Sequence, residues 1–140
     1  MSELQDATGG CLCGRIRFKF SGSPRLVEYC HCNSCRKAVG APVMAWAGVA
    51  VEQFKITKGS PGRYTSSSGV ERTFCQRCGT SLTQFAEEFA EEIYVSVSAL
   101  DDPTTTEPDI HIWRLGRLPW FEIADDLPRY QRFKSDGIFE

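Results

Sequence analysis

The sequence of 140 residues has no long hydrophobic run and no block of charge of one sign. No stretch approaches the roughly 20 apolar residues of a membrane-spanning helix. The first six residues, Met-Ser-Glu-Leu-Gln-Asp, are polar and acidic, so we expect no signal peptide, no membrane association and a cytoplasmic location. The 16 lysines and arginines are scattered and the net charge is −2, so we expect no nucleic-acid partner.

The composition is that of a globular protein. Hydrophobic residues make up 41% of the chain and aromatic residues 11%, which is too apolar for a disordered chain. The length fits one domain of ordinary size, and no internal repeat is evident. We therefore predict a single domain over residues 1–140.

Several segments have patterns typical of β-strands. Apolar and polar residues alternate over 14–20 and over 92–98, with the period of two that a half-buried strand requires. The segment 43–56 is rich in β-branched and aromatic residues and predicts two strands, or one bulged strand, broken at Gly48. Residues 109–115 predict another strand.

The remaining segments predict one short helix and several loops. Residues 33–40 begin with a capping residue, Asn33, and end in glycine, which predicts one or two helical turns. The Ser-, Gly- and Pro-rich segment 60–69 and the polar segment 101–108 predict surface loops, and the C-terminal part with its prolines is expected to be irregular. Short strands with one helix predict a mainly β fold.

All seven cysteines fall in three clusters. These are Cys11-Leu-Cys13, Cys30-His-Cys32-Asn-Ser-Cys35 and Cys75-Gln-Arg-Cys78. An odd number cannot pair completely in disulfides, and thiols stay free in a reducing cytoplasm. Thiolates at these short spacings are typical zinc ligands, so metal binding is predicted in preference to disulfides.

The spacing favours two metal sites of different kinds. Four thiolates from the two outer pairs would fill a tetrahedron and form a structural site, whereas the central triple would leave a fourth position open for water, substrate or another side chain. A second grouping is a zinc ribbon of Cys32 and Cys35 with Cys75 and Cys78, which leaves the other three thiols unused. A redox pair of Cys32 and Cys35 lacks the βαβ context typical of such motifs.

Residues near the clusters allow a functional and a structural interpretation. His31 lies between two cysteines, but neighbouring side chains of an extended segment point to opposite faces, so we do not expect it to join them on one metal. His111 is expected to be packed and hydrogen-bonded. Arg36 and Lys37 either attract an anionic substrate or offset the thiolate charge. Three tryptophans are expected to line a pocket or the core: Trp46, Trp113 and Trp120.

These motifs resemble the family of glutathione-dependent formaldehyde-activating enzymes and their relatives, which include a centromere-associated protein. The resemblance runs in order along almost the whole chain. It is carried by Gly10-Cys11-Leu-Cys13-Gly14, Cys30-His-Cys32-Asn-Ser-Cys35-Arg-Lys, Gly40-Ala-Pro42, Phe74-Cys75-Gln-Arg-Cys78-Gly79-Thr80, His111-Ile-Trp113, Leu118-Pro-Trp120 and Leu127-Pro-Arg-Tyr130.

The resemblance implies an Mss4-like fold, that is, zinc-stabilised twisted β-sheets with one short helix, like a small guanine-nucleotide-exchange protein. It implies two Zn²⁺ per chain. One would be held by Cys11, Cys13, Cys75 and Cys78, and the other, at an open and catalytic site, by Cys30, Cys32 and Cys35. The implied reaction joins formaldehyde to the thiol of glutathione and is classed with carbon–sulfur lyases.

The donor set fits that chemistry. Three thiolates on Zn²⁺ leave a net charge of −1, which makes the metal a weak electrophile but still deprotonates a bound thiol. We therefore expect an enzyme that adds a thiol such as glutathione to formaldehyde or a related small aldehyde. The alternative is a non-catalytic zinc scaffold that binds a protein partner.

Overall fold

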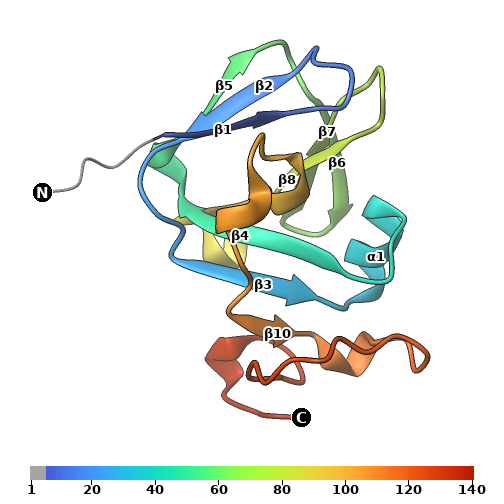
Figure 1. Ribbon diagram of the computed structural model, residues 1–140. Helices are drawn as coiled ribbons and strands as arrows, with labels where there is room; N and C mark the ends of the chain where they lie inside the picture. Colours follow the sequence, from blue (N-terminus) through green and yellow to red (C-terminus); the bar gives the residue numbers. More distant parts are fainter. Residues whose placement is uncertain (1–5) are drawn as a thin grey trace, which may run out of the picture.

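A computed structural model describes residues 6–140, and within them ten strands form two sheets (Figure 1). The smaller sheet is antiparallel with the order β1-β2-β5, and its strands are β1 (Ala7–Gly10), β2 (Arg17–Phe20) and β5 (Phe54–Lys58). The larger sheet has the order β10-β3-β4-β9-β8-β7-β6. Its strands are β3 (Leu26–Cys30), β4 (Met44–Ala50), β6 (Gly62–Ser67), β7 (Val70–Phe74), β8 (Ser81–Ala86), β9 (Glu92–Ser96) and β10 (Ile110–Ile112).

One α-helix, α1 (Asn33–Val39), occurs in the described part of the chain. The short 3₁₀ turns are Val51–Gln53, Glu87–Phe89, Val97–Ala99, Pro103–Thr105, Arg114–Gly116 and Lys134–Asp136. In the larger sheet β10 pairs with β3 in parallel, and the other neighbours are antiparallel. The predicted mainly β class with one short helix is confirmed. The closer likeness to the exchange-protein fold and the single domain over residues 1–140 stay predictions.

The first hydrophobic core contains side chains from both sheets. Ile16, Phe18 and Phe20 are each 1% exposed and pack with apolar side chains of the larger sheet such as Val49 and Val95. The alternation over 14–20 therefore buries the face that the sequence predicts.

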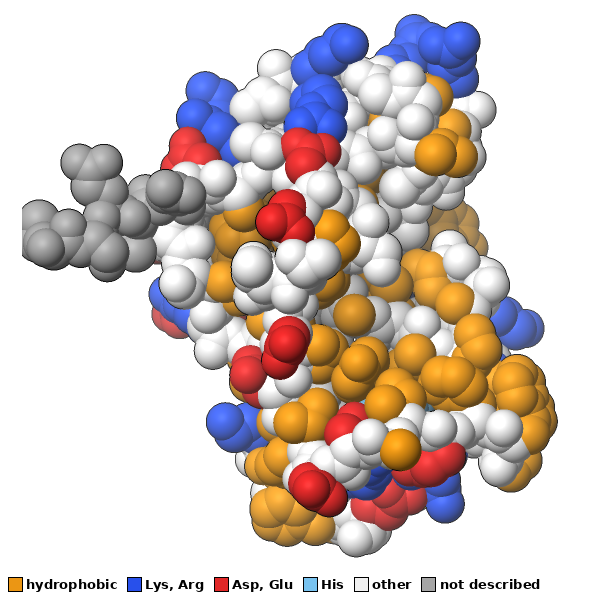
Figure 2. Space-filling view, in the orientation of Figure 1, with side chains coloured by type: hydrophobic (Ala, Val, Ile, Leu, Met, Phe, Trp, Pro, Cys, Tyr) orange, Lys and Arg blue, Asp and Glu red, His pale blue; other side chains and the backbone are white. Residues whose placement is uncertain are grey.

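The opposite face of the larger sheet carries a second core. Cys30, Trp46 and Ile112 pack there with Tyr130 of the C-terminal segment and with Cys35 of α1. In Figure 1, β10 and the C-terminal segment lie at the far end of the molecule from β1, β2 and β5. Figure 2 shows hydrophobic side chains gathered toward that end of the visible face.

Helix α1 starts differently from the prediction. Its N-cap is Cys32, whose Sγ accepts a hydrogen bond from Cys35 N at 3.3 Å, so a sulfur rather than the Asn33 side chain caps the helix. The helix ends as predicted, because Gly40 has a φ of 67° and its N–H bonds to Arg36 O.

The break predicted at Gly48 is wrong. Strand β4 runs through this residue because β3 and β9 pair with it on both sides, at Leu26 and Tyr94. A Cβ at Gly48 would lie 3.2 Å from the Tyr94 ring, so glycine permits close packing rather than a bend. The interruption falls later, in the 3₁₀ turn Val51–Gln53, and β5 follows it.

The surface loop predicted for residues 60–69 is also wrong, because β6 forms there as an exposed edge strand. It pairs with β7 across a turn in which Gly69 has a φ of 75°. An edge strand tolerates polar residues because its outer side faces water. Three strands are shorter than predicted: β2 begins at Arg17, β9 ends at Ser96 and β10 covers only Ile110–Ile112. The irregular C-terminal part is confirmed.

Among residues 6–140, no helix combines the length and the apolar character needed to cross a membrane. The expected lack of a signal peptide concerns residues that lie almost entirely outside this range.

Candidate functional site

Two similar turns present the outer cysteine pairs. Cys11 and Cys13 lie between β1 and β2, and Cys75 and Cys78 lie between β7 and β8. Glycine follows each pair in the left-handed conformation, with φ of 78° at Gly14 and 82° at Gly79. A Cβ would meet nothing within 4 Å at either glycine, so the backbone turn itself requires glycine.

Both turns aim hydrogen-bond donors at sulfur. Ile16 N lies 3.2 Å from Cys11 Sγ, and Arg77 N lies 3.4 Å from Cys75 Sγ. The Thr80 hydroxyl lies 3.3 Å from Cys78 Sγ, and hydrogen bonds with Thr80 lower the pKa of Cys78 to about 5. The same hydroxyl accepts from Leu12 N at 3.0 Å and so links the two turns. These donors stabilise thiolates.

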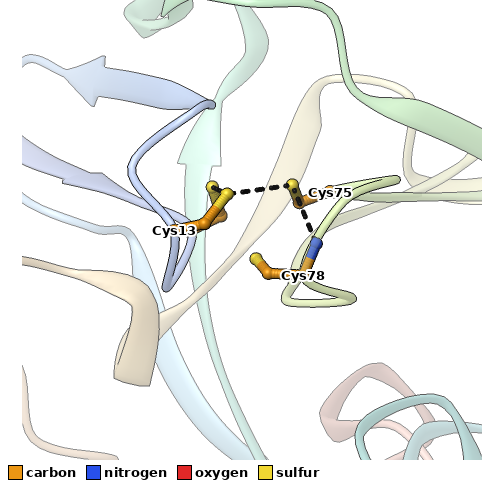
Figure 3. A group of neighbouring side chains, drawn as sticks. Cys13, Cys75 and Cys78 are labelled. Atoms are coloured by element: carbon orange, nitrogen blue, oxygen red, sulfur yellow. Dashed lines mark hydrogen bonds between the residues drawn. The ribbon is translucent and has the colours of Figure 1, made fainter.

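The four sulfurs form a compact group, here called the four-cysteine group (Figure 3). They all lie within 4.8 Å of one another, with Cys11 Sγ 3.6 Å and Cys75 Sγ 3.8 Å from Cys13 Sγ. Four thiolates at 2.3 Å from a tetrahedral zinc would stand about 3.8 Å apart. The donor set and its spacing thus fit a closed tetrahedral metal ion.

Cys30, Cys32 and Cys35 form a separate three-cysteine group, whose sulfurs also lie within 4.8 Å of one another. Cys30 ends β3, Cys32 caps α1 and Cys35 lies in the first turn of the helix. Cys30 and Cys35 are 3% and 2% exposed, and Cys32 is partly exposed. The group could hold a metal ion with one position free on the side of Cys32.

The two groups correspond to one of the groupings that the spacing allows. The zinc-ribbon grouping does not occur, because Cys32 and Cys35 gather with Cys30, whereas Cys75 and Cys78 gather with the N-terminal pair. All seven thiols are free. The assignment of these residues as metal ligands stays a prediction.

The sulfur of Cys35 has polar neighbours that the sequence did not indicate. Both terminal nitrogens of Arg72 donate to it, at 3.8 and 3.7 Å, and Trp46 Nε1 donates at 3.4 Å. Gln84 Oε1 lies 3.6 Å away. Arg72 is only 7% exposed, so its charge is buried against this sulfur and the hydroxyl of Ser66. The Arg72 and Trp46 donors favour negative charge on this sulfur. The pKa of Cys35 is nevertheless raised, because the lowering effect of Cys30 is outweighed by the hydrogen bond with Cys32 and by burial.

These neighbours come from one face of the larger sheet. Arg72 of β7 is the cross-strand partner of Gln84 of β8, which is the partner of Tyr94 of β9. Glu28 of β3 is likewise the partner of Trp46 of β4. Partners in an antiparallel pair project to the same side, so the register alone brings these polar groups together. A charged residue at a strand position that points inward was the available sequence signal. The strand register of the sheet is needed to show that these residues lie near one another.

Glu28 is a second buried ionisable group that the sequence did not indicate. It is 8% exposed, and burial raises the pKa of its carboxyl to about 8. Burial also raises the pKa of Tyr94 beside it.

The two histidines join one buried chain of hydrogen bonds. His31 Nε2 lies 2.8 Å from His111 Nδ1, and His111 Nε2 lies 2.9 Å from an Asp125 carboxylate oxygen. Burial lowers the pKa of His31 to about 4. The packed, hydrogen-bonded His111 is confirmed, and His31 is outside both cysteine groups, as expected. Asp125 was not singled out in the sequence.

Arg36 and Lys37 were predicted to attract an anionic substrate or to offset the thiolate charge, and in the structure Arg36 binds backbone carbonyls. Arg36 donates to the carbonyls of His31 and Gly116, at 3.2 and 3.1 Å, and so fixes the backbone between Cys30 and Cys32. Lys37 is exposed.

A cavity of about 100 Å³ adjoins the three-cysteine group and contacts all three of its residues. Five of its fourteen lining residues are aromatic, and most of the lining is apolar. The other lining residues are Glu28, Trp46, Val70, Gln84, Ala86, Glu88, Phe89, Tyr94, Ile112, Trp113 and Phe133. Trp46 and Trp113 are therefore pocket residues, whereas Trp120 is 71% exposed.

A larger open cleft of about 640 Å³ lies elsewhere, beside Cys11 and the Arg17–Asp101 ion pair. The cysteine that lines it belongs to the four-cysteine group, which would leave no position for a ligand if its four sulfurs held one metal ion. Size alone therefore does not mark the candidate active site, and the smaller cavity is the better candidate.

Comparison with known proteins agrees with this geometry. The profile described as "Glutathione-dependent formaldehyde-activating enzyme" matches residues 6–115, which contain all seven cysteines. The chain belongs to this family.

Two curated relatives carry related names. A putative glutathione-dependent formaldehyde-activating enzyme of Halomonas elongata is 30% identical over 126 residues, or 82% of this chain and 79% of its own length. An uncharacterized lyase of Schizosaccharomyces pombe is 36% identical over 79 residues, and the match spans 56% of this chain and only 57% of that protein.

A solved structure of a Rhodobacter sphaeroides protein shares the fold of this family member. It superposes with a TM-score of 0.57 at 21% identity, covering 72% of this chain and 96% of the other. At that identity the likeness shows the fold alone.

Proposed function

We propose that the chain is a zinc-dependent enzyme of the carbon–sulfur lyase type, which adds a thiol such as glutathione to formaldehyde or a related small aldehyde. The observation that carries the proposal is the three-cysteine group in the wall of an aromatic cavity. Family membership supports the same chemistry. We further propose a single domain over residues 1–140 and, because all seven thiols are free, a reducing cytoplasmic location.

The two cysteine groups take different roles in this proposal. Cys11, Cys13, Cys75 and Cys78 hold a structural zinc, and Cys30, Cys32 and Cys35 hold the zinc of the active site. A zinc ion bound there would keep a substrate thiol in its thiolate form at neutral pH. Two zinc ions per chain follow.

The reaction needs no oxidant or reductant. The substrate thiol loses its proton, its sulfur forms a bond to the carbonyl carbon, the carbon–oxygen π bond breaks, and the oxygen takes up a proton to give an S-hydroxymethyl thioether. Thiols and formaldehyde combine spontaneously in water, so the contribution of the protein is mainly to bring the partners together.

The surrounding residues suit this task. Arg72 and Trp46 donate to Cys35 Sγ and hold its negative charge in place. The aromatic wall formed by Phe89, Trp113 and Phe133 excludes water from the reacting groups.

The test is adduct formation with formaldehyde, followed by exchange NMR in separate reactions with glutathione and with a small thiol that has no negative charge. With at least one thiol the zinc-loaded protein should exceed the rate of buffer with the same reactants, and Cys32→Ser should abolish the excess. Ser34→Ala, an exposed change on the same helix, is the matched control and should retain it. A rate equal to that of buffer with every thiol, with zinc bound, would rule out the enzyme.

One observation favours the alternative of a non-catalytic scaffold. Leu115, Trp120 and Phe139 in the last third of the chain are 58%, 71% and 60% exposed, and exposed apolar side chains are common at protein contacts. Thiol binding without rate enhancement would assign the protein to that class.

A further inference from the structure

The cavity beside the three-cysteine group is small and closed on most sides. Its volume of about 100 Å³ lies below the roughly 300 Å³ at which pockets for complete small ligands begin. A tripeptide cannot be enclosed there. The cavity admits a short chain of a few atoms that leads to the sulfur of Cys32, the partly exposed member of the group.

The lining contains no positive charge. Among the described residues that line the cavity there is no lysine or arginine, and the two carboxyl side chains are Glu28 at the buried end and the exposed Glu88. Whatever the protonation state of Glu28, neither residue attracts an anion.

The arginines near the cavity are bound to other groups. Arg72 is buried against Cys35 Sγ and Ser66 Oγ, and Arg36 is bonded to two backbone carbonyls. Arg132 lies over Trp113, 5.9 Å from the ring centroid, and does not line the cavity. A carboxylate that entered the cavity would lose its hydration without gaining a cationic side chain as a partner, and three thiolates on a zinc ion beside it leave a net charge of −1, so its burial is costly.

The side chains that line the cavity favour a positively charged ligand group. Five aromatic residues line the cavity: Trp46, Phe89, Tyr94, Trp113 and Phe133. Aromatic faces attract ammonium groups, and a carboxylate at the rim adds to this attraction.

We propose that the substrate of this cavity is a small thiol without negative charge, with an aminothiol as the best-fitting class, and that glutathione with its two carboxylates is disfavoured. This inference rests on the proposed function and narrows its substrate. The family profile and the name of the Halomonas elongata relative specify glutathione, so the inference assigns this chain a thiol preference that differs from those names.

The test uses three thiols of similar size: cysteamine, 2-mercaptoethanol and 3-mercaptopropionate, which are positive, neutral and negative. Their binding to the zinc-loaded protein is measured by calorimetry, and the shift of the Trp46 indole N–H signal in NMR reports occupation of the cavity. We expect cysteamine to bind about 10-fold more tightly than 3-mercaptopropionate, with 2-mercaptoethanol between them and glutathione no tighter than the anion.

Glu88→Gln should reduce the ratio of cysteamine to 3-mercaptopropionate affinity at least about 3-fold, since it removes the rim carboxylate. Glu87→Gln is the control, because Glu87 is an exposed neighbour that does not line the cavity. Since the thiols are the same for each protein, a change in ratio does not depend on their intrinsic acidity.

The outcomes distinguish a wrong charge selection from a wrong assignment of thiol addition. Equal affinities, or tighter binding of glutathione or the anion, would overturn the charge selection and leave thiol addition standing. An unchanged ratio in Glu88→Gln would likewise overturn it. If no thiol binds to the zinc-loaded protein, both the selection and the proposed function are wrong.

Discussion

Arg72 places a positive charge inside the molecule, and its main partner is a sulfur. A guanidinium that is 7% exposed needs a compensating negative group, since an unpaired buried charge is strongly unfavourable. Cys35 Sγ accepts from both terminal nitrogens, so Arg72 favours the thiolate form of Cys35, against Cys32 and burial, which raise the pKa of this thiol. Arg72 would thereby offset the negative charge of a metal site built from three thiolates.

Replacement of this arginine should weaken metal binding at one site only. In Arg72→Gln we expect the affinity of the three-cysteine group for zinc to fall roughly 10- to 100-fold, the usual effect of losing a group that supports a ligand. Chelator competition, followed with an optical zinc indicator, measures it. Arg63→Gln on β6, whose side chain is 64% exposed, is the control. Equal affinities in Arg72→Gln and the unchanged protein would contradict a role for Arg72.

Some residues of the site can be predicted from the sequence, and others cannot. Cysteine spacing identifies both groups, because ligands of one metal must converge locally before distant segments meet. No comparable sequence pattern indicates Arg72 or Glu28, since each resembles an ordinary solvent-facing residue of a strand. Their burial follows from the strand register, and a shift of one position would send either to the other face.

The cysteine groups act differently on the elements that they join. The four-cysteine group connects the β1–β2 turn to the β7–β8 turn, with Cys13 and Cys75 separated by 62 positions. The three-cysteine group lies within β3 and the start of α1. Closing a long loop removes more entropy from the unfolded chain than closing a short one.

Cys78→Ser and Cys32→Ser should therefore have unequal effects. We expect Cys78→Ser to lower the free energy of unfolding by about 2–5 kcal/mol or to prevent folding, since it opens the long-range link. Cys32→Ser should cost under about 1 kcal/mol and leave the fold intact, because its link is local. Urea unfolding of the zinc-loaded proteins, followed by circular dichroism, provides the comparison. Equal destabilisation would show that the three-cysteine group is structural as well.

The chain Asp125–His111–His31 joins the C-terminal segment to β10 and β3. Burial lowers the pKa of His111 below its ordinary value of 6.5, so the folded protein holds this ring neutral. The unfolded chain binds more protons below that pH, so the contribution of His111 to stability is complete above pH 6.5 and is lost as the pH falls below it.

The pH dependence should therefore depend on His111. Between pH 7.5 and 5.5 the unfolding temperature of the unchanged protein should fall more than that of His111→Gln, which has no ring to protonate. Acid also releases metal from thiolates, but it does so in both proteins, so the difference between the two curves isolates the histidine. Parallel curves in differential scanning calorimetry would show that this group does not titrate on unfolding.

At the scale of elements, the sequence predicted the features that depend on one segment of the chain alone. The alternation of β2 and the glycine at the end of α1 are local signals, and both are confirmed. β6 was missed because its residues favour a turn, and only the hydrogen bonds with β7 make them a strand. The sulfur cap of α1 was missed because Asn33 beside it is a common capping residue.

At the scale of the whole molecule, residues 6–140 form two cores on the two faces of one sheet, and each core contains part of one cysteine group. Cys11 and Cys75 pack in the core shared with the smaller sheet, whereas Cys30 and Cys35 pack in the core near the C-terminal segment. A metal in either group would bind the folded chain and stabilise it. Two sites in separate cores need not lose their ions together.

Chelation should remove zinc in two stages. The protein purified under reducing conditions should hold up to two zinc ions per chain, and the one at Cys30, Cys32 and Cys35 should leave first, because three ligands from one segment hold it less firmly than four. After the first stage the far-ultraviolet circular dichroism should be unchanged, and the second stage should bring unfolding, since it opens the link between β1–β2 and β7–β8. Cys32→Ser should show the second stage only. Zinc analysis and circular dichroism along a chelator titration measure both, and a protein with intact thiols and no zinc would contradict the metal assignment entirely.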